Sequence, residues 1–162
     1  MIWKKVEKEY KSIIERTKDA KSGEEQFEIH REYYKFTADV QTSMELAMIR
    51  HDIDTTDEFY EKESDFYDEV GPIISQYENE YGKVLYDSPY RDYLESKIGK
   101  VTFKNIEIAN KAFDEKIIPL MQEENALSSR YSKLIATAKI PFEGEVYNLS
   151  LMRKFQTSRT VS

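Results

Sequence analysis

The chain has 162 residues, and its 31 acidic and 24 basic side chains give a net charge of −7. Because no basic patch is present to neutralise phosphates, nucleic acid is not an expected partner, and no apolar run is long enough to span a membrane. The chain contains no cysteine, which excludes disulfides, thiol nucleophiles and thiolate zinc sites. We therefore expect a protein of the reducing cytoplasm.

The composition favours helices. Charged residues make up 34% of the chain, which has only five glycines and four prolines. This balance is typical of long helices with solvated outer faces rather than of a turn-rich sheet protein. We predict an all-α fold, a bundle of about six helices with one small C-terminal β-hairpin, forming a single domain over residues 1–162.

The first half of the chain has apolar residues at intervals of three or four, the spacing of one helix face. A first helix is predicted over residues 6–17 and a second over residues 24–50. A third helix begins at Thr56, whose hydroxyl is expected to cap it. Gly71-Pro72 is expected to kink or briefly break this helix, because proline removes one helical hydrogen bond.

The second half carries shorter elements. Pro89 is expected at the first position of a fourth helix, and Gly99 is expected to end it. The remaining predicted helices cover residues 90–98, 103–113 and 119–138. Within the last of these, the polar run 122–125 is expected to face solvent.

The tail changes character after the sixth helix. Residues 139–142 and 145–149 are predicted to be two short strands around a Glu143-Gly144 turn. An isolated hairpin is only marginally stable, so this one must lean on a neighbouring element. A short helix is predicted after Ser150.

The two histidines were the first candidates for a metal site. His30 and His51 lie outside any HExxH motif, and neither has glutamate three residues before it, so the zinc-protease and di-iron patterns are absent. The doublet His51-Asp52 lacks the further histidines that a metal phosphohydrolase needs. We predict that His30 is a surface residue and that His51 lies near the negative end of the second helix.

The segment 52–63 resembles an EF-hand loop in its spacing of oxygen side chains. Such a loop needs glycine at its sixth position, which here is Asp57. The segment is thus open to two interpretations. One is an ordinary turn between helices, and the other is the calcium site of a small calcium sensor.

Three segments, in order, resemble the oligoendopeptidase F family of zinc metallopeptidases, which are relatives of thimet oligopeptidase. The first is IRHDIDTTDEFYEKESDFYDE at 49–69. The second is SPYRDYLESKIG at 88–99, and the third is QEENALSSRYSKLIATAKIPFEGEVYNLSLM at 122–152. The resemblance covers nearly the whole chain.

The resemblance implies that this chain is the N-terminal, non-catalytic part of such a peptidase. In the family, zinc is held by an HExxH helix and a downstream glutamate in the C-terminal catalytic part, which this sequence does not contain. We therefore assign no catalytic, cofactor-binding or metal-binding residue here, and expect zinc only in the full-length enzyme. The last residues, 156–162, depart from the family pattern, which indicates a cloned fragment or a prematurely ended reading frame.

The family's N-terminal domain forms part of the wall of a deep cleft that admits short peptides. The expected partners are thus the C-terminal catalytic domain of the same polypeptide and short peptides, and exposed apolar area predicts some self-association. Arg50, His51 and Tyr60 are the candidate cleft or interdomain contacts. The alternative function is a free-standing helical module that binds proteins or peptides without cutting them.

Overall fold

Seven α-helices, one 3-10 turn and one β-hairpin make up the fold of residues 3–156, which this computed structural model describes. The predicted all-α class with a C-terminal hairpin is confirmed. Among these residues, no helix is long and apolar enough to cross a membrane. The helices are α1 (Trp3–Asp19), α2 (Gly23–Ile53), α3 (Glu58–Tyr86), α4 (Arg91–Ile98), α5 (Lys100–Ala112), α6 (Ile118–Ala136) and α7 (Leu149–Gln156), with the 3-10 turn η1 (Glu115–Ile117) before α6.

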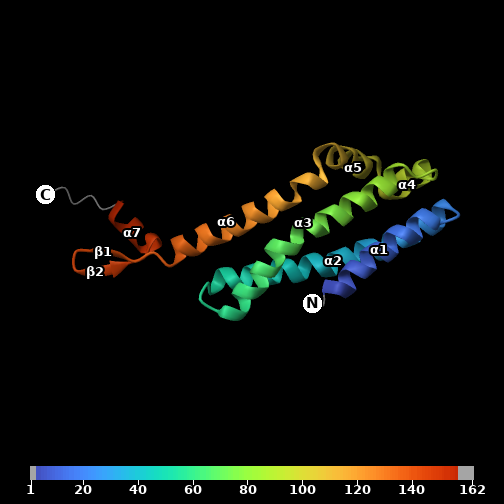
Figure 1. The fold of residues 1–162 in the computed structure, drawn as a ribbon. Coiled ribbons are helices and arrows are strands. Elements are labelled where there is room, and N and C mark those ends of the chain that lie inside the picture. Colours follow the sequence, from blue (N-terminus) through green and yellow to red (C-terminus); the bar gives the residue numbers. More distant parts are fainter. Residues whose placement is uncertain (1–2, 157–162) are drawn as a thin grey trace.

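Helices α1, α2 and α3 lie side by side, and α4 and α5 pack against one end of them (Figure 1). Helix α1 shows why: its buried side chains recur every three or four residues and so form one face. Those residues are Val6, Tyr10, Ile13, Ile14 and Thr17. Burial of this face against α2 and α3 fixes the arrangement of the three helices.

Side-chain caps set where α2 and α3 begin. The Ser22 hydroxyl accepts a hydrogen bond from the Glu25 backbone N–H at 3.1 Å and caps α2. The prediction that Thr56 caps the third helix was wrong, because the Asp57 carboxylate accepts from Phe59 N–H at 2.8 Å. The Thr56 hydroxyl instead donates to the Asp54 carboxylate, so α3 begins two residues later, at Glu58.

Helix α3 runs unbroken through Pro72, so the alternative of a short break there was wrong, while the kink stays a prediction. Buried side chains such as Val70 and Ile74 continue on both sides of it. The prediction for Pro89 also needs correction. Pro89 does not open the fourth helix. The Ser88 hydroxyl accepts from the Tyr90 N–H at 3.0 Å, which makes a turn, and α4 begins at Arg91.

The buried core lies entirely within α1–α5 and their connections. One cluster joins all five helices around Ile13, Leu85, Leu94 and Phe103. A second cluster joins α1, α2 and α3 around Tyr10, and its ring stacks on that of Tyr77 with centroids 5.5 Å apart. From α6 to α7, no described residue of a helix or strand is buried.

The C-terminal hairpin pairs strand β1 (Ile140–Phe142) with β2 (Glu145–Tyr147), antiparallel, as predicted. Glu143 and Gly144 have φ of 51° and 84°, the two positive values that a type I′ turn requires. The hairpin leans on α7, where the Phe155 ring lies 4.8 Å from that of Phe142 and 5.2 Å from that of Tyr147. Hairpin and α7 lie beyond the end of the helical layers (Figure 1).

Candidate functional site: a polar groove between α6 and the α2–α3 corner

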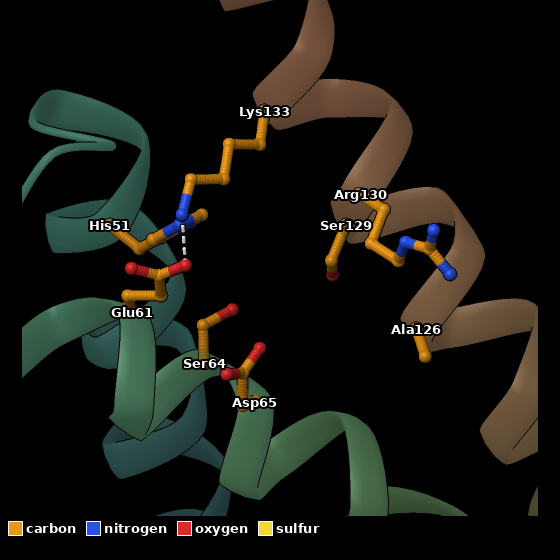
Figure 2. Close-up of a pocket in the computed structure, with 8 residues that line it drawn as sticks. All are labelled: His51, Glu61, Ser64, Asp65, Ala126, Ser129, Arg130 and Lys133. Carbon is orange, nitrogen blue, oxygen red and sulfur yellow. Dashed lines mark hydrogen bonds and ion pairs between the residues drawn. The ribbon is translucent and has the colours of Figure 1, made fainter. Parts of the chain in front are cut away.

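A polar groove separates α6 from the corner where α2 turns into α3. One cavity of about 280 Å³ lies there, and Figure 2 shows the side chains that surround it. A neighbouring cavity of about 310 Å³ shares His51, Ser64 and Ser129 with the first. We call the two together the polar groove. The first cavity is lined by His51, Glu61, Ser64, Asp65, Ala126, Ser129, Arg130 and Lys133.

His51 is the most buried polar group on the α2 side of the groove, with 7% of its surface exposed. It lies in the last turn of α2, as predicted, where carbonyl groups make the helix end negative. Its Nδ1 is 4.0 Å from the Asp52 carboxylate.

Helix α6 is held to α3 by hydrogen bonds from its polar side chains. The Gln122 and Asn125 amides donate to the backbone carbonyls of Glu69 and Asp68, at 2.7 and 3.2 Å. The Ser129 hydroxyl donates to the Asp68 carboxylate at 2.5 Å. The prediction that the run 122–125 is a solvated face was thus wrong for two of its four residues.

An ion pair between α3 and α6 lines the first cavity of the groove. The Lys133 ammonium donates to the Glu61 carboxylate across the gap between α6 and α3 (Figure 2). This hydrogen bond and the positive charge of Lys133 lower the pKa of Glu61 below its ordinary value. The Arg130 guanidinium extends away from this pair, which leaves it available to other contacts (Figure 2).

The structure brings the three predicted contact residues to the same corner. The Arg50 guanidinium carbon lies 5.7 Å from the centroid of the Tyr60 ring, within cation–π range. Arg50 is exposed, Tyr60 is half-buried and His51 faces the groove. Their role as cleft or interdomain contacts stays a prediction.

The groove does not have the geometry of a catalytic centre. Among the residues that the structure describes, no serine hydroxyl is hydrogen-bonded to His51, and no group of three histidines or carboxylates could hold a metal ion. The carboxylates of Asp54 and Asp57 accept backbone N–H groups of the turn and of α3, so they act as caps. Residues 54–57 thus form the turn between α2 and α3, and the other residues of the segment 52–63 belong to these two helices.

The prediction that His30 is a surface residue was wrong. Its Nδ1 lies 3.0 Å from the Tyr81 hydroxyl, and the two rings stack with an interplanar angle of 8°. Burial lowers the pKa of His30, because the protonated ring loses solvation. His30 is therefore part of the aromatic packing between α2 and α3.

Comparison with known protein families identifies the family of this chain. Residues 1–113 match the family described as Peptidase M3 N-terminal domain. This match covers more than half of the chain and ends within one residue of the last turn of α5. The chain therefore belongs to the peptidase M3 family, as its N-terminal domain. No curated protein matches the chain.

Three solved structures are similar to the whole chain. PZ peptidase A, crystallised with an inhibitor, is 39% identical with a TM-score of 0.92 over 98% of this chain. A putative oligoendopeptidase F is 37% identical with a TM-score of 0.89 over 95%. Another, from Bacillus anthracis str. Ames, is 35% identical with a TM-score of 0.89 over 96%. The chain spans only about 27–28% of the length of these proteins.

Proposed function

We propose that this chain is a non-catalytic wall of the substrate cleft in a zinc-dependent oligopeptidase. It narrows the cleft entrance, so that short peptides enter and folded proteins do not. One observation carries this proposal: 95–98% of the chain superposes on little more than a quarter of three longer chains, each named as a peptidase or oligoendopeptidase. The chemistry then belongs to the remaining part of such a polypeptide.

The residues of this chain agree with a supporting role. Since the described residues offer no cluster that fits zinc, the metal would be held by the catalytic part of the enzyme. The long side-by-side packing of α1, α2 and α3 gives a stiff wall, because their apolar faces are fixed against each other along two buried clusters. A stiff wall sets a width for the cleft that does not adapt to a larger substrate.

The α2–α3 corner is the part of this wall that we assign to peptide contact. Arg50 is exposed, and the Tyr60 ring restricts its guanidinium group. A restricted guanidinium loses less entropy when it binds, and it can hold the C-terminal carboxylate of a short peptide with two hydrogen bonds.

The direct test is a chimera. The segment of PZ peptidase A that matches this chain is replaced by residues 1–162, and hydrolysis of short peptides and of a folded protein is measured. We expect the chimera to cleave peptides and to spare the folded protein. An inactive chimera with normal zinc content and a cooperative melting transition would contradict the proposed function.

The contact residues are tested in the same chimera. Arg50→Gln is expected to raise KM for a peptide with a free carboxylate roughly tenfold, with kcat little changed, because a charge-assisted hydrogen bond is lost. Arg31→Gln is the matched control, since Arg31 is also exposed on α2 and pairs only with Glu28 within its own helix. Equal KM values for the two variants would remove Arg50 from the cleft.

A further inference from the structure

Helix α6 turns a polar face toward its neighbour α3 and an apolar face toward solvent. From Gln122 onward, its half-buried positions are all polar and face α3: Gln122, Asn125, Ser129 and Lys133. Its large apolar side chains are mostly exposed, and four of them form a stripe. The stripe consists of Leu120 (64% exposed), Leu127 (54%), Tyr131 (65%) and Leu134 (69%).

The stripe lies on the side of α6 that faces away from α3. With about 3.6 residues per turn, positions spaced by seven, four and three residues share one face. The same rule places the four polar residues on a second face, about half a turn from the first. A helix that packs on α3 only for its own stability would have these two faces exchanged.

Exposed apolar side chains continue from α6 into the hairpin and α7. Val146 is 64% exposed, and Leu149 and Leu151 are 44% and 54% exposed. Large apolar side chains gathered on one exposed helix face mark a contact with another polypeptide surface. By contrast, the largest side chains of α1, α3, α4 and α5 include several that are almost fully buried, such as Tyr10, Leu85, Leu94 and Phe103.

We propose that the apolar stripe of α6 docks onto the part of the peptidase polypeptide that follows this domain. This inference rests on the proposed function and names the surface through which the wall joins the catalytic part. Two findings select this occupant. The N-terminal family match ends at residue 113, before α6 begins, and the similar peptidases extend far beyond the matched segment.

The two faces of α6 have different roles. The polar face holds α6 against α3 with directional hydrogen bonds, which fix its register. The apolar stripe then provides the non-directional contact area that the following part of the polypeptide covers. Helix α6 is thus the layer between the five-helix core and the remainder of the enzyme.

The test uses a photo-crosslinking amino acid in the chimera described above. Tyr131 on the stripe is replaced by benzoylphenylalanine, and in a second protein Tyr34 is replaced in the same way. Tyr34 is the matched control, because it is an equally exposed aromatic residue (72%) on α2. Crosslinked peptides are identified by mass spectrometry after digestion.

We expect position 131 to crosslink to peptides of the catalytic part several times more often than position 34. Crosslinks from position 131 to a second copy, or equal crosslinking at the two positions, would overturn the docking surface. A chimera that is active but gives no crosslink at 131 refutes this inference and leaves the proposed function standing. An inactive chimera that crosslinks at 131 supports the docking surface and counts against the proposed function.

A second variant checks the same surface through stability. The double substitution Leu127→Asn and Leu134→Asn is expected to lower the melting temperature of the chimera by several degrees while leaving that of the 162-residue chain unchanged. The control is Leu46→Asn on α2, where the side chain is 45% exposed. An equal shift in both proteins would show that the stripe has no partner in the longer polypeptide.

Discussion

Helices α1–α5 enclose the whole buried core, although α2, α3 and α5 also expose some large apolar side chains, whereas no described helix or strand residue from α6 to α7 is buried. The first region follows the usual logic of a folded domain, in which burial of one face supplies the driving force. The second region is held to the first by a few hydrogen bonds and one ion pair. The difference teaches that the sequence contains one complete core and one unfinished layer.

The largest expected effect comes from making the same change in both regions. Leu94→Ala removes a fully buried side chain of the core and is expected to cost about 2–5 kcal/mol of unfolding free energy. Leu134→Ala, at a position 69% exposed, is expected to change it by less than about 0.5 kcal/mol. Urea denaturation of the isolated chain measures both, and similar costs would remove the distinction between the regions.

Two glycines sharpen the account of the core. A Cβ at Gly23 would lie 2.7 Å from Tyr93 Cδ1 and 3.1 Å from its Cβ, so α2 and α4 would have to move apart. Gly23→Ala is therefore expected to destabilise the chain by about 1–3 kcal/mol.

Gly71→Ala is the control within α3. Its added Cβ would meet only Met44 Cε at 3.7 Å, an ordinary contact. Alanine is the better helix former by about 0.5–1 kcal/mol, but a Cβ at this position also crowds the ring of Pro72 in the helical conformation. The two effects oppose each other, so Gly71→Ala is expected to change stability much less than Gly23→Ala. Equal destabilisation of the two variants in thermal unfolding would contradict the close packing of α2 on α4.

A smaller effect is expected at the polar face of α6. Ser129→Ala removes the hydrogen bond to Asp68 and is expected to cost about 0.5–1.5 kcal/mol, expressed as local opening of α6. The adjacent, exposed Ser128→Ala is the control. Amide hydrogen exchange should rise in α6 for the first variant alone. A rise throughout α1–α5 would mean that the two regions unfold as one.

The smallest expected effect is a pH dependence of the same contact. Lys133 lowers the folded-state pKa of Glu61 below 4.5, so this pair adds stability above the unfolded pKa and loses it as pH falls through the folded value. Exchange in α6 should therefore increase below about pH 4.5. Glu61→Gln should abolish this dependence, and an unchanged pH profile would show that another carboxylate controls it.

Much of the first region could be predicted from the sequence, because its apolar spacing and its buried faces obey the same periodicity. The helices around Tyr10 and Leu94 are where that periodicity places them. The caps were harder to predict: Thr56 and Asp57 are both good N-cap residues, and only the backbone geometry decides between them. The break considered at Pro72 does not occur, because favourable packing around it outweighs a single lost hydrogen bond.

The second region was read less well. The helix and the hairpin around Glu143-Gly144 were predicted, and the sequence indicated that the hairpin needs a support without identifying it as Phe155. The run 122–125 was predicted to face solvent, but Gln122 and Asn125 donate to α3, because a helix can also be held to its neighbour through polar side chains. The signal was present in the helical spacing of Gln122, Asn125, Ser129 and Lys133, opposite a stripe of leucines.

The most direct measurement of the central claim is hydrogen exchange of the 162-residue chain alone and within the peptidase chimera. We predict that amides of α1–α5 exchange at the same rates in both proteins, since their core is complete. Amides of α6 and α7 should exchange much more slowly in the chimera, where the following polypeptide covers the apolar stripe. Equal protection of α6 in the two proteins would contradict the claim that this layer is completed by the rest of the enzyme.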